Sequence, residues 1–172
     1  MSIFKKKQSP KISPERLYRS IPVTNPGLKY EEDSNGIVTI LIPVKERGSD
    51  RVIRTAKIKL DIIGSKVWKK IDGKTSIGEI IEWMKKEFMI TTKEADVSLS
   101  MFLNSLIERK LIALILPPPK PGTPEVQEEI ERISFEIKEL EKAYKKKKVD
   151  EKTYREIREK YEEAIRELKE KG

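Results

Sequence analysis

A proline-rich spacer, PPPKPG at residues 117–122, constrains the fold of this chain more than any other feature. Proline lacks a backbone N–H and fixes φ, so such a run continues neither a helix nor a sheet and tends to extend as polyproline II. The chain has 172 residues, enough for one ordinary domain or for a small domain with an extension. The spacer therefore predicts a domain that ends near residue 116 and a separate extension from residue 123.

The chain contains neither cysteine nor histidine. Disulfides, thiolate chemistry, imidazole bases and zinc sites built on these residues are therefore excluded. Carboxylates, Lys, Tyr, Ser and Thr remain, and they form no convergent catalytic motif. We expect a protein that is not an enzyme and that needs no cofactor or metal.

No apolar run approaches the roughly 20 residues of a membrane helix, and MSIFKKKQSPK at the start lacks the apolar core of a secretory signal. A cytoplasmic location is expected, which the absence of cysteine also suits. Charged residues make up 38% of the chain and Lys and Glu dominate them, a balance typical of heat-tolerant proteins.

Residues 1–27 contain four prolines and are expected to form an extended basic arm, with one helical turn at Pro14–Arg19. They carry six basic residues and one acidic residue, whereas residues 117–172 carry fifteen of each. Much of the net charge of +8 therefore belongs to a short arm. This distribution weakens a nucleic-acid function, which requires a basic stripe on a folded face.

Residues 28–116 are predicted to form an α+β domain that begins with a three-stranded antiparallel meander. Its strands are LKYEED (28–33), GIVTILIPV (36–44) and RTAKIKLD (54–61). The third strand alternates cleanly, with Ala56, Ile58 and Leu60 on one face and Lys57 and Lys59 on the other.

Three helices are predicted to follow the sheet. The first spans about 62–71, with Ile63, Val67 and Ile71 on its buried face. The second begins after a cap at Thr75 or Ser76, beyond the turn Asp72–Lys74, and the third is capped by Thr92. Residues 111–116 are then predicted to form a short strand or an extended exit from the domain.

Residues 123–172 are predicted to form an antiparallel helical hairpin. Thr123 caps its first helix, and apolar residues from Val126 to Tyr144 recur at steps of four and three, as along a coiled-coil seam. Asp150 caps the second helix, which repeats the seam from Tyr154. Phe135 and Ile165 lie off this seam, so a further contact is expected with the main domain, a partner or a second copy, the last giving a homo-oligomer.

Residues 56–112 resemble the PqqD family of peptide chaperones, also called leader-peptide recognition elements. The resemblance lies in a strand ending in LD, then IGSKVWKKIDGKTSIGEII and EADVSLSMFLNSLIERKLI. It implies a three-stranded sheet packed on three helices, related to winged helices. It also implies a non-catalytic adaptor that holds a ribosomally made precursor peptide and presents it to a modifying enzyme, often a radical-SAM enzyme.

The resemblance further implies where the peptide lies, as a strand added beside the third strand and against the third helix. An edge strand offers free backbone groups for such pairing. The expected peptide-binding residues of the strand are Arg54, Thr55, Ala56, Lys57, Ile58, Lys59 and Leu60. Those of the third helix are Val97, Met101, Asn104 and Ser105, with Ser98 as a further candidate.

Two alternatives remain open. The Gly73 turn between two helices also suits a winged-helix DNA-binding regulator. However, the second and third helices lack a concentrated basic face, and Lys85 and Lys86 are their only adjacent basic residues. Lys57 and Lys59 are as well explained by solvation as by peptide contact, because exposed charges contribute little.

Overall fold

The computed structural model describes residues 11–171 and divides into two compact units. One unit spans residues 18–117. The other combines residues up to Leu17 with those from Pro118 onward.

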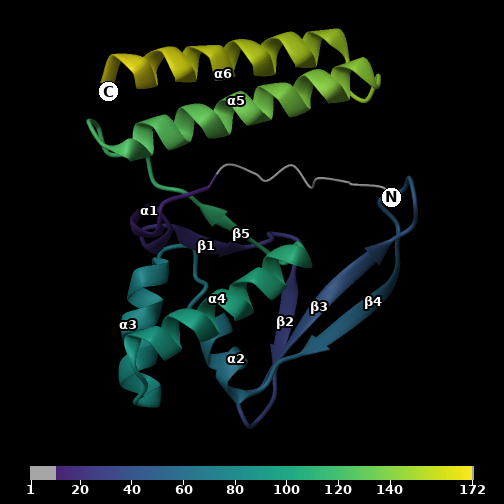
Figure 1. Ribbon diagram of the computed structural model, residues 1–172. Coiled ribbons are helices and arrows are strands. Elements are labelled where there is room, and N and C mark those ends of the chain that lie inside the picture. The colour runs from purple at the N-terminus through teal and green to yellow at the C-terminus, as the bar shows by residue number, and fades with distance from the viewer. Residues whose placement is uncertain (1–10, 172) are drawn as a thin grey trace, which may run out of the picture. The chain divides into compact units, whose positions relative to one another are not determined.

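The first unit contains a three-stranded antiparallel sheet in the order β2-β3-β4 (Figure 1). The strands are β2 (Lys29–Glu32), β3 (Val38–Lys45) and β4 (Val52–Lys59). The predicted meander and the α+β class are therefore confirmed. Val38 and Ile40, at the centre of β3, are fully buried and anchor the sheet in the core.

Three helices follow the sheet: α2 (Ile62–Trp68), α3 (Ile77–Phe88) and α4 (Thr92–Glu108). Ser65 ties α2 to the sheet, because its buried hydroxyl donates to the Asp61 carbonyl at 2.6 Å and accepts the Val38 N–H at 2.9 Å. Trp68 lies edge-on to Tyr30 of β2 and is 3% exposed. The core continues through Ile80, Ile81 and Met84 of α3 and Leu99, Leu103 and Leu106 of α4.

Helix caps define the start of α3 and α4. Ser76 and Glu79 form a reciprocal capping box at α3. Thr91 and Glu94 form another at α4, so the cap is Thr91 and the prediction of Thr92 is wrong by one residue. Asp72 accepts the N–H groups of Lys74 and Thr75 in the preceding turn. These backbone bonds, the one from Thr75 foremost, lower the pKa of Asp72.

A second, two-stranded sheet joins distant parts of the chain. Strand β1 (Ile21–Thr24) pairs antiparallel with β5 (Ile112–Ile115), with Ile21 opposite Ile115. The Ser20 carbonyl accepts the Ile77 N–H at 2.9 Å, which holds the start of α3. The segment expected to be an extended arm therefore contains a strand that belongs to this unit, while its residues 1–10 lie outside the described chain.

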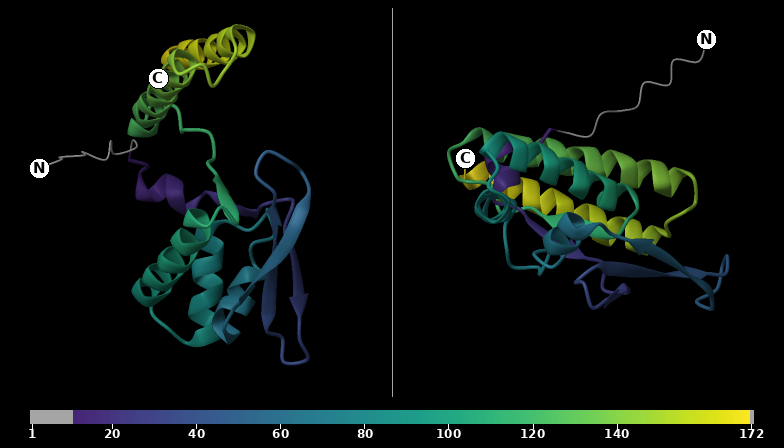
Figure 2. Two further views of the ribbon diagram at one scale, coloured as in Figure 1. Left: turned by 90° about the vertical axis from the view of Figure 1, so that its right-hand side faces the viewer. Right: turned by 90° about the horizontal axis from the view of Figure 1, so that it is seen from below.

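The second unit is built on the helices α5 (Pro124–Lys145) and α6 (Glu151–Lys171). Both views of Figure 2 and that of Figure 1 show the two helices side by side, as the predicted hairpin requires. Thr123 precedes α5 without a side-chain cap bond, because its hydroxyl instead donates to the Lys120 carbonyl. Asp150 accepts the Thr153 N–H at 2.9 Å, as predicted for α6.

The N-terminal helix α1 (Pro14–Tyr18) begins in this second unit, and its predicted helical turn is confirmed. Arg16, 2% exposed, forms a 2.7 Å ion pair with Glu129 of α5. The Ser13 N–H donates to Glu128 at 3.1 Å. The described start of the chain is therefore fastened to the C-terminal hairpin.

Candidate functional site

The candidate site is the edge of the sheet formed by β4, which pairs with β3 alone among the described strands. Its register places Ile40 opposite Ile58 and Leu41 opposite Lys57. The Leu60 N–H donates to the Val38 carbonyl at 2.9 Å, which extends the same register by one hydrogen-bonded pair. Hydrogen-bonded and non-hydrogen-bonded pairs alternate in an antiparallel ladder. The backbone groups of Thr55, Lys57 and Lys59 therefore point away from β3.

Pro43 supports this assignment. It stands opposite Thr55, and proline has no N–H to donate. A pair that contains proline fits the ladder where the hydrogen bonds between the two strands are absent. The free edge thus presents the N–H and C=O groups of three residues.

An irregularity limits the length of the edge. Val44 lies opposite Arg54 and Lys45 opposite Val52, so Ile53 is an extra residue on β4. Such a bulge disrupts regular pairing. At the other end, the Asp61 side chain accepts the Gly64 N–H at 2.6 Å and starts α2. Regular pairing is therefore available from Thr55 to Lys59.

The predicted alternation of β4 is reproduced in its side chains. Ala56 and Ile58 are half-buried and share the sheet face of Ile40, whereas Thr55, Lys57 and Lys59 are exposed on the opposite face. The remaining members of the predicted strand lie at its ends, with Arg54 exposed on β4 and Leu60 just beyond it.

Ion pairs cross the exposed face of the sheet. Lys57 Nζ lies 3.9 Å from Glu31 and Lys59 Nζ lies 3.8 Å from Asp33. The two lysine side chains remain 63% and 69% exposed, so these pairs contribute little to stability. The pKa of Asp33 is lowered, chiefly by the backbone N–H of Ile37 and in smaller part by Lys59.

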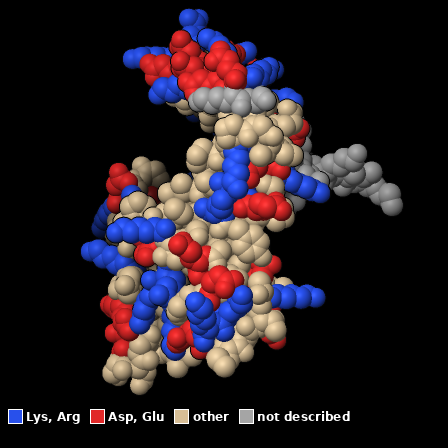
Figure 3. Space-filling model, turned by 90° about the vertical axis from the view of Figure 1, so that its left-hand side faces the viewer, with Lys and Arg blue, Asp and Glu red and all other residues tan. Residues whose placement is uncertain are grey.

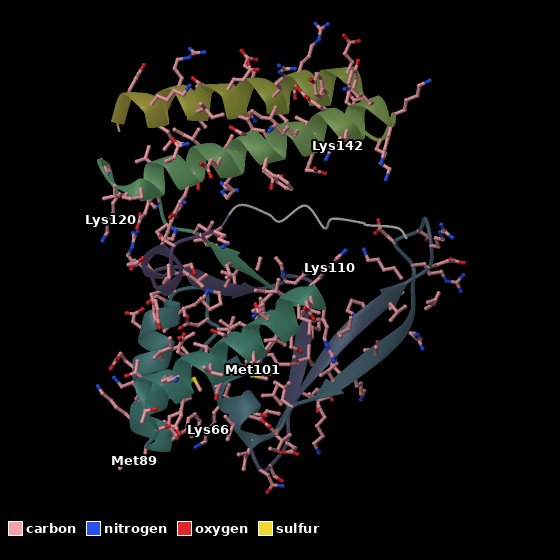
Figure 4. The ribbon with its side chains drawn as sticks, viewed as in Figure 1. Lys66, Met89, Met101, Lys110, Lys120 and Lys142 are labelled. Atoms are coloured by element: carbon pink, nitrogen blue, oxygen red, sulfur yellow. The ribbon has the colours of Figure 1, made fainter. Side chains whose placement is uncertain are left out.

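The predicted residues of the third helix all lie on the exposed side of α4. Val97 is 51% exposed, and Met101, one helical turn further on and labelled in Figure 4, is 70% exposed. Asn104 and Ser105 are also exposed. The core instead takes Leu99, Leu103 and Leu106. Val97 and Met101 therefore form an exposed apolar pair on α4.

Two exposed isoleucines were missed by sequence reasoning. Ile62 and Ile63 open α2, which two residues separate from the end of β4, and are 57% and 49% exposed. The prediction that Ile63 shares a buried face with Val67 is therefore wrong. A methyl group on Gly64 would lie 3.3 Å from the Phe102 ring, so α2 and α4 touch at this turn. Glycine within a helix was the available signal of that close contact.

Pockets lie next to the free edge of β4 and beside the β1–β5 sheet. One of about 220 Å³ is lined by Gly27, Lys29, Leu41, Pro43 and Thr55, next to the free edge. Another of about 370 Å³ lies between the β1–β5 sheet and the end of α4, with Ile107 and Ile112 among its lining residues. Their walls are mostly apolar or uncharged.

The described residues contain no group of three or more acidic side chains suited to a metal ion. Among them, no helix has both the length and the apolar character that crossing a bilayer requires.

The fold defines a class, a small α+β domain in which a three-stranded sheet packs on three helices and β4 forms one of the two sheet edges. Residues 52–112 match the family described as coenzyme PQQ synthesis protein D (PqqD). This segment, from β4 to the start of β5, therefore belongs to the PqqD family, and the resemblance noted in the sequence is confirmed. No curated protein and no solved structure gives a significant match to the chain.

Members of the PqqD family are non-catalytic accessory proteins. They bind precursor peptides and partner radical-SAM enzymes that modify those peptides. The match covers β4, α2, α3 and α4, the elements that carry the candidate site. It does not cover β1, β2 and β3 or the C-terminal hairpin.

Proposed function

We propose that this protein captures an extended segment of a precursor peptide by strand addition at β4 and presents it to a modifying enzyme of the radical-SAM type. The observation that carries the proposal is the outward direction of the backbone groups of Thr55, Lys57 and Lys59 on an unpaired edge. Backbone pairing at such an edge supplies affinity, and flanking side chains supply selectivity.

The surroundings of the edge support peptide binding. Ile62 and Ile63 lie just beyond the end of β4, at the start of α2, and the contact between Gly64 and Phe102 brings α4 to the same turn. Val97 and Met101 add exposed apolar surface on α4. Side chains of an added strand can bury apolar area here, at about 25 cal/mol per Å².

The distribution of charge does not favour the winged-helix DNA-binding alternative. Figure 3 views the molecule from the side of α3 and shows the two signs intermixed. Lys66 pairs with Glu87 at 2.6 Å and Lys85 with Glu82 at 2.9 Å. A DNA-reading surface instead gathers unpaired cations on one face.

The proposal is tested by Lys57→Pro, which removes an N–H that points away from β3 and adds a ring to the edge. Proline is tolerated on an edge strand at such a position, so the variant should fold. Peptide affinity should fall at least about tenfold, because a hydrogen bond is lost and the added strand is obstructed. Isothermal titration with the cognate precursor peptide measures the change.

The matched control is Lys57→Ala, which keeps the backbone N–H and removes only the side chain. It should retain most of the affinity that Lys57→Pro loses. Equal affinity of wild type and a folded Lys57→Pro variant would rule out strand addition at β4.

A further inference from the structure

The edge of β4 also restricts the side chains of any strand that it accepts. Paired residues of neighbouring strands direct their side chains to the same face of a sheet, and successive residues alternate between faces. Residues opposite Ala56 and Ile58 would therefore point to the helix-covered side. Residues opposite Thr55, Lys57 and Lys59 would point to the exposed side.

The helix-covered side selects apolar residues. Ile58 is half-buried there beside fully buried Ile40, and the exposed Ile62 follows three residues after β4 ends. A polar group placed opposite Ile58 would lose water without a described hydrogen-bond partner on these side chains, which costs free energy.

The exposed side selects negative charge at two positions. On the exposed face, Lys57 shares a row with Leu41 of β3 and Lys29 of β2, and Lys59 shares a row with Thr39 of β3 and Glu31 of β2. Asp33 lies one residue beyond the end of β2. Each lysine reaches its present acidic partner diagonally over the intervening strand β3. A carboxylate on an added strand would lie directly opposite, with Cβ atoms about 5 Å apart.

The third position on the exposed side differs from the other two. Thr55 carries no charge and lines the cavity of about 220 Å³ with Leu41 and Pro43. The negative charges of the peptide are therefore expected at two positions and not along its whole length.

We propose, on the basis of the strand-addition function, that the captured segment has an acidic–apolar–acidic pattern. Its two carboxylates lie opposite Lys57 and Lys59, and its apolar residue lies opposite Ile58. The side chain opposite Thr55 is uncharged. The ligand class is thus an extended acidic peptide with an apolar residue between two Asp or Glu residues.

A display library of random peptides of about ten residues tests this pattern against the full-length protein at low salt. Selection on wild type should enrich the acidic–apolar–acidic pattern. The charge-reversed variant K57E/K59E should select a basic–apolar–basic pattern. An acidic peptide chosen on wild type should bind this variant about tenfold more weakly, because two attractive cross-strand pairs become repulsive.

Because Glu31 and Asp33 would repel the new carboxylates, K57Q/K59Q provides a second variant that removes charge without adding repulsion. It should still enrich apolar residues but lose the preference for acidic ones. Acidic enrichment that persists on K57Q/K59Q would overturn the inference, since the carboxylates would then contact other residues.

The Lys57→Pro variant separates the two proposals. Suppose that the peptides enriched on wild type are lost on Lys57→Pro but contain no paired acidic residues. This result would overturn the charge pattern and leave strand addition intact. Equal enrichment on wild type and Lys57→Pro would instead overturn strand addition, and the charge pattern with it.

Discussion

At the scale of single residues, Glu129 is a buried carboxylate that two arginines hold. It is paired with Arg16 and Arg132, and its side chain is 10% exposed. Burial raises its pKa, but hydrogen bonds from Arg132 and Arg16 outweigh burial and hold the pKa below the usual value. Its charge therefore stabilises the second unit.

Glu129→Gln should lower the free energy of unfolding by about 3 kcal/mol at neutral pH, because a buried arginine loses its countercharge. Urea denaturation measures the change. Glu162→Gln is the matched control, since Glu162 pairs with Arg158 at the surface and the loss should stay below about 0.5 kcal/mol. Equal losses would contradict the importance of burial at Glu129.

The same residue predicts a pH dependence. Because the folded pKa of Glu129 is lowered, its stabilisation is complete above the pKa of the unfolded chain, where glutamate has its ordinary value. It is lost as the pH falls through the lower, folded pKa. Wild type should therefore lose stability on acidification relative to Glu129→Gln, and the difference between them should shrink below about pH 4.

At the scale of elements, the start of α4 distinguishes two adjacent threonines. The Thr91 hydroxyl accepts the Glu94 N–H at 3.2 Å, and the Glu94 carboxylate accepts the Thr91 N–H at 2.8 Å. Thr91→Ala should cost about 1 kcal/mol. Thr92→Ala, within the first turn of the helix, should be neutral or slightly stabilising, because alanine has the higher helix propensity. Thermal denaturation of both variants tests the assignment, and the reverse order would refute it.

Several elements of the first unit could be predicted from the sequence. The three strands were predictable from alternation and turn residues, and the capping box at Thr91 was visible as a threonine three residues before Glu94. The strand β1 was not predictable from its sequence. Its four residues lie among prolines and form a strand only because they pair with β5, far along the chain.

Sequence patterns could predict which strand carries the candidate site, but not which of its backbone N–H groups point away from the sheet. Alternation placed Lys57 and Lys59 on one face of a strand, but which N–H groups point outward depends on the pairing register with β3. The exposure of Ile63 depends on how α4 crosses α2 at Gly64, a contact that periodicity within one helix cannot show. Whether these residues bind a peptide is still a prediction.

At the scale of the whole molecule, the boundary of the first unit can be tested. A fragment of residues 18–117 contains both β1 and β5 and the Ser20 carbonyl that holds α3. It should unfold in one cooperative transition and keep the peptide affinity of the full chain within about twofold.

A fragment of residues 28–116, the domain predicted from sequence alone, is the matched control. It lacks β1 and buried Ser20, so its free energy of unfolding should be lower by at least about 2 kcal/mol. Circular dichroism during urea unfolding measures both fragments. Equal stability would show that β1 is dispensable for this unit.

The hydrogen bond from the Ser13 N–H to Glu128 cannot form until Glu128 has been synthesised. The two residues are 115 positions apart, and the ribosome adds about 5–20 residues per second. The first helix of the nascent chain therefore waits on the order of ten seconds for its partner to be made. Residues 18–117 are synthesised before Glu128, so the sheet that contains β4 can form before the second unit assembles.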